Sequence, residues 1–435
     1  MSGASLRNNA FVLGVATAVL AIAGDWSGDE TAGILWRIPA ALLLLGLAYE
    51  SWLVSRVAMS LEVSAEQQFF LGRSTAVTFA IRHATRRTWP VELAPAAPDF
   101  FEIEDAIIPL TVAPDRAARR ECRVIPTRLG KHAWPQLHVR VGGPLGLAWW
   151  PKKLDAAFAV AVKPDLFRSA GEVRGTADAG AQIGLDMGGG TEVMRLRDYR
   201  DGDPPRVVDW KATARAGRLI SRDFAVNDGL QIVIAIDAGR TSGLRAGHLD
   251  RFGHYVNIAA RLAQLAADRD DLVGVVVYAD RPLAALAPAR GPHALVRLRE
   301  LLASSRVENR ESNPLLAAMR VRSLVRHRSL VILLTDVDDA TTGSQLAQAA
   351  RLLLPQHLPF IAGLSSEAAQ AMAQSPAGEW LDPYRSLAAQ EYCIGLQRKV
   401  SSLNALGAAA LIARPQHLEH AVFAAYADFR RRRRV

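Results

Sequence analysis

Cysteine is nearly absent from this chain of 435 residues. The only two, Cys122 and Cys393, lie far apart and have no CxxC partner. Neither a disulfide framework nor a cysteine zinc cluster is therefore supported, and a reducing compartment fits best. The phosphate-loop order GxxxxGK[ST], a GxSxG elbow and an HExxH motif are also missing, and the histidines at 417 and 420 have no evident third ligand. These absences leave an enzyme without support in the sequence.

The composition indicates a folded chain with an anionic neighbour. Half of the residues are hydrophobic, and 52 Lys and Arg face 43 Asp and Glu, with a pI near 9.9. The length allows two or three domains. The basic balance is compatible with a membrane surface or with nucleic acid.

Two apolar stretches, at about residues 10–24 and 34–54, predict a transmembrane hairpin within residues 1–58. Lys and Arg are absent from the connector between them, whereas Arg7 precedes the first stretch and Arg56 follows the second. By the positive-inside rule, both ends then lie in the cytoplasm. This predicts location in the inner membrane, contact with membrane lipids, and soluble domains that face the cytoplasm.

Two alternatives to the hairpin stay open. Arg7, a short apolar core and the run Ala21-Ile22-Ala23 also satisfy the pattern of a cleavable signal peptide. A buried hairpin of a soluble protein would look similar. The second apolar stretch, which follows at once, favours the membrane hairpin.

Residues 59–155 read as a small antiparallel β-sandwich. Short alternating stretches at 74–83, 117–126 and 135–141 carry β-branched and aromatic residues at period two, and no useful helical run interrupts them. Residues 156–229 read as a connector that contains a glycine-rich loop and a charged block at 195–224.

The charged block is the most distinctive stretch of the chain. The simplest interpretation is that this block is a solvated charged face. A sharper one is that arginine–carboxylate pairs and a packed Trp210 lock it onto a neighbouring domain or a partner. Nucleic acid is not expected, because the balanced acids offset the attraction of phosphate. The candidate partner-binding or interdomain residues are Tyr199, Asp203, Arg206, Asp209, Trp210 and Arg215.

Within this block, "LRDYRDGDPPRVVDWKATARAGRL" resembles the signature of the domain of unknown function 58 family. These are bacterial proteins whose genes accompany MoxR-type AAA+ ATPases. The stretch "RVIPTRLGKHAWPQLHVRVGGPLGLAWW" is similar to the family as well, although Gly143 stands where the family more often has Asp. The resemblance implies a membrane hairpin, a β-rich domain and a von Willebrand factor A-like domain, and it supplies no activity.

Residues 230–435 alternate as a doubly wound α/β fold does. Apolar runs at 230–236, 272–279, 329–335, 358–364 and 408–413 predict strands, and residues 249–265 have helical spacing. A mostly parallel sheet with right-handed crossovers is the expected architecture.

Asp237 and Asp336 each follow a predicted strand, where a parallel sheet places its ligand site. A von Willebrand factor A-like domain implies a metal-ion-dependent adhesion site there, with a DxSxS loop and a threonine on a second loop. Here the loop reads DAGRT and the threonine position is an asparagine beside Ser312.

The site is therefore degenerate, because Gly239 has no side-chain oxygen and Arg240 brings a positive charge. Candidate Mg²⁺ or Mn²⁺ ligands are Asp237, Thr241, Asn313 and Asp336. Without a metal, the two aspartates would cap helices or pair with Arg240.

The leading hypothesis is a membrane-anchored interaction protein that binds a partner through the carboxyl-end face of its sheet. The resemblance implies a MoxR-type AAA+ ATPase as that partner. The alternatives are a metal-assisted hydrolase that uses Asp237 and Asp336, and a nucleic-acid-binding protein. The five arginines at 430–434 read either as a frayed tail or as a contact with anionic headgroups.

Overall fold

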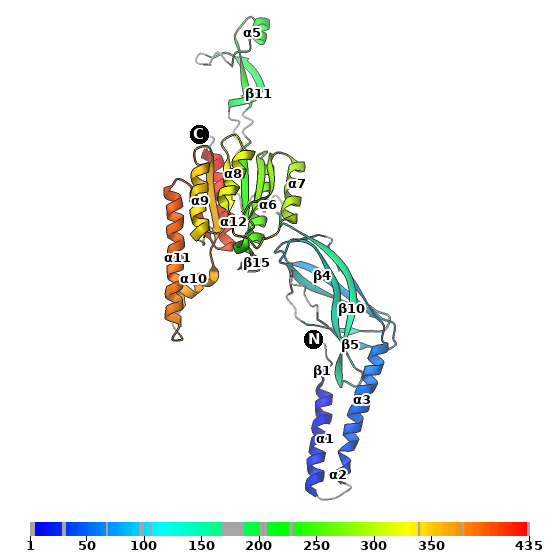
Figure 1. Ribbon diagram of the computed structural model, residues 1–435. Coiled ribbons are helices and arrows are strands. Elements are labelled where there is room, and N and C mark those ends of the chain that lie inside the picture. Colours follow the sequence, from blue (N-terminus) through cyan, green and yellow to red (C-terminus); the bar gives the residue numbers. More distant parts are fainter. Residues whose placement is uncertain are drawn as a thin grey trace. The chain divides into compact units, whose positions relative to one another are not determined.

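The computed structural model of the chain describes residues 5–27, 32–66, 68–94, 100–103, 107–166, 187–200, 203, 207–225, 229–337, 340–375 and 378–432. The chain divides into two compact units, residues 1–163 and 164–435. Each unit is described by itself (Figure 1).

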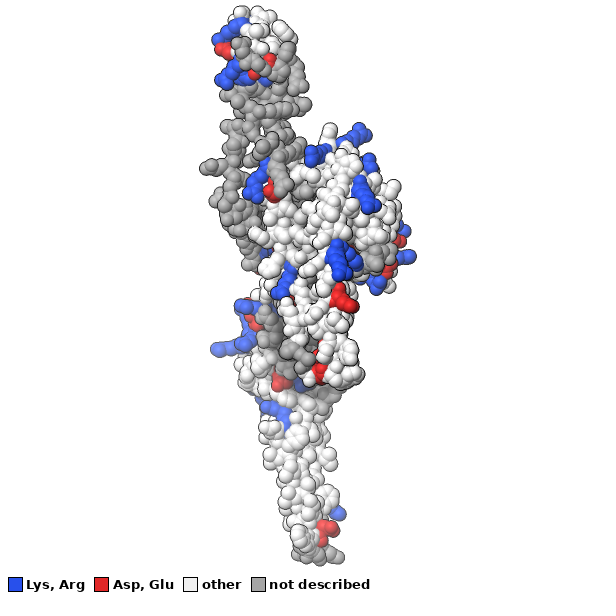
Figure 2. Space-filling model, turned by 90° about the vertical axis from the view of Figure 1, so that its left-hand side faces the viewer, with Lys and Arg blue, Asp and Glu red and all other residues white. Residues whose placement is uncertain are grey.

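The first unit begins with a helical hairpin. Helices α1 (Asn8–Ser27) and α3 (Arg37–Arg56) lie side by side and are joined through α2 (Ala32–Leu35) (Figure 1). Both α1 and α3 are long and apolar enough to cross a membrane. Their large apolar side chains are exposed, among them Phe11, Ile22 and Leu45. The surface of the hairpin is uncharged along most of its length (Figure 2).

A buried carboxylate ties α3 to the β-strands of the same unit. Glu50 is fully buried, and it accepts hydrogen bonds from the backbone amides of the turn between β9 (Gly130–Gly142) and β10 (Ala148–Lys163). The donors are the amides of Leu145 at 2.8 Å, Leu147 at 3.3 Å and Ala148 at 3.1 Å, and the indole of Trp150 at 3.4 Å. A Cβ on Gly143 would lie 2.0 Å from Glu50 Cδ. Glu50 therefore fills the space that an aspartate at position 143 would need.

Two sheets form the rest of this unit, and nearly all of their strand pairs are antiparallel, as expected. One has the order β2-β4-β8-β6, and the other has the order β1-β10-β9-β5-β7, with β3 parallel to β10. The rings of Phe79 in β4 and Trp134 in β9 pack edge to face, with centroids 5.9 Å apart, so the two sheets share a core. β10 continues past the expected boundary at residue 155 to Lys163, across an irregularity between Asp155 and Phe158. The remaining strands are β1 (Ser5–Leu6), β2 (Met59–Ala65), β3 (Gln68–Phe70), β4 (Thr75–His83), β5 (Trp89–Ala94), β6 (Phe101–Ile103), β7 (Ile108–Val112) and β8 (Ala118–Pro126).

The second unit starts with an arm built from the charged block. Strands β11 (Met187–Asp198) and β12 (Ile220–Ala225) pair antiparallel, and the short helix α5 (Trp210–Ala216) lies between them in the sequence. The segment expected to be a connector thus contains regular structure of its own. Most of the glycine-rich loop lies outside the described residues.

The remainder of the second unit is a mostly parallel sheet with helices, as predicted. The strand order is β17-β16-β13-β18-β19-β20, in which only the edge strand β17 runs antiparallel to its neighbour. The strands are β13 (Gln231–Asp237), β16 (Leu272–Tyr278), β17 (Pro282–Ala289), β18 (Leu330–Leu334), β19 (Leu358–Leu364) and β20 (Ala409–Ala413). A two-stranded ribbon, β14 (Arg245–Ala246) and β15 (Leu249–Asp250), follows β13.

Helices cover this sheet, and the core lies between the layers. The buried side chains of Val233 and Ala235 belong to one cluster with residues of α8, α9 and α11. Helices α6 and α12 contact β13 and β19. The helices are α6 (Arg251–Ala267), α7 (Pro292–Ser304), α8 (Pro314–Leu324), α9 (Ala340–Leu353), α10 (Glu367–Gln374), α11 (Asp382–Ala405) and α12 (Pro415–Arg432).

The first arginine of the basic run is part of this fold. Arg430 lies on α12 and donates to the buried carboxylate of Asp271 at 2.5 Å, and Tyr426 also donates to that carboxylate. Of the two interpretations of the basic run, a frayed tail does not describe Arg430, because Arg430 pairs inside the domain, and contact with anionic headgroups stays a prediction. Residues 433–435 lie outside the described residues.

Candidate functional site

The sheet order places the carboxyl ends of β13 and β18 side by side. The order reverses at β13, and in open α/β sheets ligands bind at such a switch point. Asp237 is the last residue of β13, and Thr335 and Asp336 follow β18 directly. Both aspartates are buried, with 0% and 2% exposure. The two predicted strand-end carboxylates therefore lie at neighbouring strand ends, and this part of the sheet is called the crevice below.

Donors from the protein satisfy both oxygens of Asp237. Oδ1 accepts from the amide of Gly239 at 2.8 Å and from Ser312 Oγ at 2.5 Å, and Oδ2 accepts from Thr335 Oγ1 at 2.6 Å. Burial raises the pKa of the Asp237 carboxyl, and these hydrogen bonds act in the opposite direction. The sequence pointed to Asp237 but not to the hydroxyls of Ser312 and Thr335 that hold it.

Ser312 occupies the space that a side chain at position 239 would need. A Cβ on Gly239 would lie 2.2 Å from Ser312 Oγ. A serine at position 239 would therefore displace Ser312 from Asp237. The hydroxyl that the DAGRT loop lacks is supplied from the loop that precedes α8.

The other two loop candidates have local roles in the backbone. Asn313 caps the N-terminus of α8, where its Oδ1 accepts from the amide of Leu316 at 3.2 Å. Thr241 is half-buried in a short 3₁₀ helix, η2 (Arg240–Gly243). The cap accounts for the asparagine at position 313 without a metal.

Asp336 pairs with an arginine that the sequence did not single out. Arg251 lies at the start of α6 and forms an ion pair with Asp336 Oδ2, and the two side chains are 6% and 3% exposed. From the sequence alone, a buried arginine at the start of a helix cannot be told from an exposed one. Only its contact with Asp336 in the structure shows the difference. The guanidinium supplies the positive charge that a cation in this crevice would bring.

Arg240, which was expected beside the carboxylates, contacts a different acid. Its guanidinium donates to Glu311 Oε1 at 2.7 Å and 3.1 Å, and both side chains are more than half exposed. Such exposed pairs contribute about 0–1 kcal/mol. Arg240 and Glu311 thus belong to the rim of the crevice.

The donor set does not fit a divalent cation. Mg²⁺ requires about six oxygens in near-octahedral geometry and usually keeps several waters. Here the oxygens of Asp237 accept from two hydroxyls and an amide, and a guanidinium contacts Asp336 Oδ2, while Asp336 Oδ1 has no hydrogen-bond partner among the described residues. A cation at Asp336 would therefore lie against the positive charge of Arg251. In the part of the chain that the structure describes, three or more His, Cys, Asp or Glu residues never gather closely enough to hold a metal. We derive no chemistry through a metal at this crevice.

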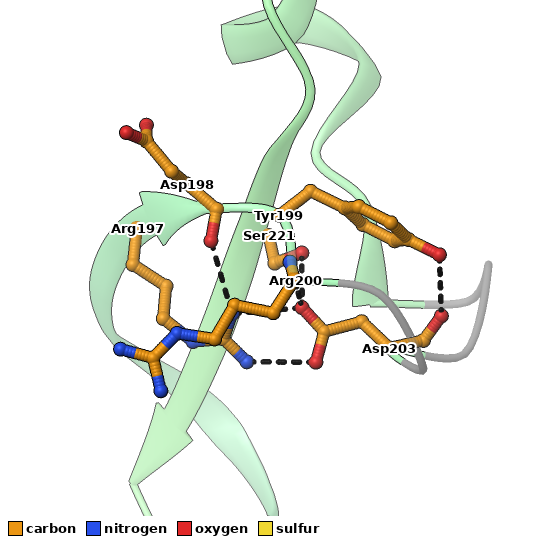
Figure 3. A network of polar contacts seen from close by, with 6 residues as sticks. All are labelled: Arg197, Asp198, Tyr199, Arg200, Asp203 and Ser221. Carbon is orange, nitrogen blue, oxygen red and sulfur yellow. Dashed lines mark hydrogen bonds and ion pairs between the residues drawn. The ribbon is translucent and has the colours of Figure 1, made fainter.

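The arm is organised around Asp203 (Figure 3). Arg197 donates to both of its oxygens, at 2.7 Å and 2.9 Å, and the amide of Arg200 and Ser221 Oγ also donate to it. The hydroxyl of Tyr199 donates to the backbone carbonyl of Asp203 at 3.1 Å. The hydrogen bond from Arg197 lowers the pKa of the Asp203 carboxyl, with the Arg200 amide contributing in the same direction. Asp203 and Tyr199 therefore form hydrogen bonds within the arm and stabilise its conformation.

Asp209 braces the next part of the arm. As the N-cap of α5, its Oδ1 accepts from the amides of Lys211 and Ala212, both at 3.0 Å. Gly217 ends the helix in the left-handed region, with φ of 67°. The short helix thus has a defined start and end, which fix the position of Trp210.

Trp210 and Arg215 are available at the surface of the arm. The Trp210 side chain is 67% exposed, and Arg215 is exposed as well. Trp210 therefore does not pack within the arm, and its role in holding the arm against a neighbouring domain or a partner stays a prediction. Arg206 lies outside the described residues.

Comparison with protein families shows one match, and it covers both the arm and the crevice. The family described as "Protein of unknown function DUF58" matches residues 195–358. Residues 195–358 form a DUF58 domain. The domain runs from the arm through β13 and β18 to the start of β19, so it includes Asp203, Asp237, Arg251 and Asp336. Among curated proteins there is no match.

Solved structures share only limited similarity with the chain. The CARDB domain of the PF1109 protein from Pyrococcus furiosus, in complex with di-metal ions, is 11% identical over 24% of this chain and 93% of that domain, with a TM-score of 0.18. A cohesin module from a Clostridium perfringens family 33 glycoside hydrolase is 10% identical over 25% of this chain and 99% of the module, with a TM-score of 0.16. At these scores, the role of the DUF58 domain has to be argued from its own residues.

Proposed function

We propose that this chain is a membrane-anchored adaptor whose DUF58 domain binds a protein partner. The observation that carries the proposal is that both aspartates are buried, with hydrogen bonds to both oxygens of Asp237 and an ion pair between Arg251 and Asp336 Oδ2. A metal-assisted hydrolase would need an open coordination position, and here the Arg251 guanidinium lies beside Asp336 Oδ2, where it would repel a cation. A site of this kind presents a surface to a partner and has no reactive group to offer a substrate.

The surface around the crevice is suited to recognition. Arg240, Glu311 and Leu244 are each more than half exposed at the loops that follow β13 and precede α8. This rim combines the Arg240–Glu311 ion pair with the apolar side chain of Leu244, close in sequence to the hydrogen-bonded Asp237. We propose that the partner contacts this carboxyl-end face, and the family resemblance suggests a MoxR-type AAA+ ATPase. The sheet order with one antiparallel edge strand supports a von Willebrand factor A-like fold for the unit.

The anchor is the helical hairpin. Its exposed apolar side chains, the connector without Lys or Arg, and Arg7 and Arg56 at the two ends support a hairpin with both ends in the cytoplasm. Arg56 lies over the ring of Trp52 at 4.1 Å, a pairing suited to the membrane surface. Glu50 would hold the hairpin to the β-sheets. We propose location in the inner membrane, with the DUF58 domain in the cytoplasm.

A binding experiment with charge reversal tests the proposal. The full-length chain in detergent is immobilised, and a purified MoxR-type ATPase is added in solution. We expect the Arg240→Glu variant to bind at least tenfold more weakly than the unchanged chain, because the reversal sets two negative charges side by side at the rim. Arg297→Glu is the matched control, since Arg297 is exposed on α7 away from the loops that form this rim. Absence of binding by the unchanged chain, or an equal loss with both variants, would refute the proposed face.

A further inference from the structure

Helix α11 has apolar residues on two opposite faces. Ala389, Leu396 and Leu403 are buried on one face, and Leu396 and Leu403 belong to the core of the sheet. On the other face lie Tyr384, Leu387 and Ile394, with Trp380 in the preceding turn, and these side chains are 68%, 56%, 46% and 79% exposed. At 100° per residue, the two sets lie on opposite sides of the helix. The outer set therefore has no cover within the part of the chain that the structure describes.

The outer residues repeat with the spacing of a coiled-coil seam. Positions 380, 384, 387, 391, 394 and 398 are separated by alternating steps of four and three residues. Glu391 and Arg398 occupy two of these positions and are exposed. Among the described residues, neither forms an ion pair. The stripe is thus a heptad seam with apolar residues in its first half and two charges toward its end.

We propose that α11 pairs antiparallel with α11 of a second copy of this chain. In one antiparallel register, centred on position 389, every seam residue meets a seam residue of the other copy. The three layers are Trp380 with Arg398, Tyr384 with Ile394, and Leu387 with Glu391, and the twofold axis repeats each layer. The guanidinium of Arg398 then lies on the indole of Trp380, a favourable cation–π contact. A parallel pairing would instead set Glu391 against Glu391 and Arg398 against Arg398.

A glycine inside α11 supports close approach of another helix. Gly395 lies in the helix interior, where glycine costs about 1 kcal/mol relative to alanine. A Cβ at this position would meet no atom within 4 Å, so the domain's own packing does not require glycine there. Gly395 and Ala388 border the stripe on one side, and small residues at such positions let two helix backbones come near each other.

The contact is short, which makes it dependent on concentration. From position 380 to 398 the seam is about 27 Å long at 1.5 Å per residue. An interface of this length is smaller than a standard stable one. The proposed membrane anchor would confine two copies of the full-length chain to one surface, and this confinement would raise their effective concentration. We therefore expect the dimer to be seen in membranes, and to be weak in dilute detergent.

Cysteine crosslinking in native membranes tests the register. Two differently tagged full-length chains, both carrying Cys393→Ser, are expressed together, one with Leu387→Cys and the other with Glu391→Cys. In this matched pair, mild oxidation is expected to join the two tags at least tenfold more than in a mismatched control pair with Leu387→Cys and Arg398→Cys. Adding Tyr384→Asp to both chains is expected to reduce the product at least tenfold, and circular dichroism checks that this exposed change leaves the fold intact.

Three results would overturn the inference. Equal crosslinking in the matched and mismatched pairs would indicate random collision. A product that Tyr384→Asp leaves unchanged would show that the seam does not form the contact. No product in either pair would assign the stripe to another occupant, such as a different protein or the lipid surface.

Discussion

The crevice of the DUF58 domain and its arm each hold an arginine–carboxylate pair, but water reaches the two pairs to different extents. The side chains of Arg251 and Asp336 are 6% and 3% exposed, whereas those of Arg197 and Asp203 are 22% and 16% exposed. A buried pair has lost its hydration, so each partner depends on the other. The more exposed pair sets the shape of a surface segment. The same two residue types therefore form a buried pair between the end of β18 and α6 in one region and brace a surface segment in the other.

The largest effect is expected when the buried pair is broken. Arg251→Met leaves the Asp336 carboxylate buried without its partner, which costs about 3–5 kcal/mol in comparable cases. We expect the calorimetric unfolding transition of the DUF58 domain to move to a markedly lower temperature. Arg251→Lys keeps a positive charge and serves as the matched control, with a smaller loss. If Arg251→Met melts like the unchanged chain, the pair does not hold the crevice closed.

The buried carboxylate of Glu50, on the hairpin, differs from both pairs because its hydrogen-bond donors are neutral. Glu50→Ala removes the acceptor from three backbone amides, and an unsatisfied buried donor costs about 1–3 kcal/mol. Hydrogen exchange at Leu145, Leu147 and Ala148 should become faster in the variant. Glu50→Gln keeps one acceptor oxygen and should lie between the two. Unchanged exchange in Glu50→Ala would show that the turn is held by other contacts.

Acidification should weaken the sheet region before it weakens the arm. Burial lowers the pKa of His254 and of His357 below the ordinary value. The unfolded chain then binds more protons than the folded one, so stability falls as the pH drops below about 6.5. The lowered pKa of Asp203 gives a contribution that is present above about pH 4 and is lost only as the pH falls further.

Calorimetry between pH 7 and pH 5 checks the first part, and hydrogen exchange of the arm, corrected for intrinsic pH dependence, checks the second. A domain transition that does not shift over this range, or an arm that loosens first, would contradict the assignment of these groups.

The smallest effect on stability is expected from the exposed face of the arm. Trp210→Ala removes a side chain that is 67% exposed, so the unfolding temperature should not change. Affinity for the proposed partner, a MoxR-type ATPase, should nevertheless fall if the arm contributes to binding, and the binding measurement described above detects this. Val296→Ala on α7 is a control, since Val296 is also an exposed apolar residue. A clear drop in unfolding temperature with Trp210→Ala would show that the tryptophan is packed after all.

Periodicity in the sequence predicts much of the fold but not the partners in the crevice. The apolar runs at 272–279, 329–335 and 358–364 correspond to β16, β18 and β19, and they place Asp237 and Asp336 at neighbouring strand ends. Buried parallel strands have a strong one-dimensional pattern, because both of their faces are apolar.

The contacts that decide the chemistry are long-range and leave no such pattern. Ser312 is 75 positions from Asp237, and Arg251 is an ordinary residue at the start of a helix. In the sequence, Glu50 is a lone acid near the end of the second apolar stretch, and only its backbone donors show why it is there. The antiparallel edge strand β17 was not predicted, since its sequence, PLAALAPA, has no alternation of apolar and polar residues.

Calorimetric titration of the full-length chain with Mn²⁺ and Mg²⁺ tests most directly whether the crevice is closed. With Asp237 held by hydroxyls and Asp336 held by Arg251, we predict no saturable heat for the unchanged chain and the same trace for Asp237→Asn. Stoichiometric binding to the unchanged chain that disappears in Asp237→Asn would contradict the account. The crevice would then be a metal site, and the case for an adaptor without its own chemistry would lose its main support.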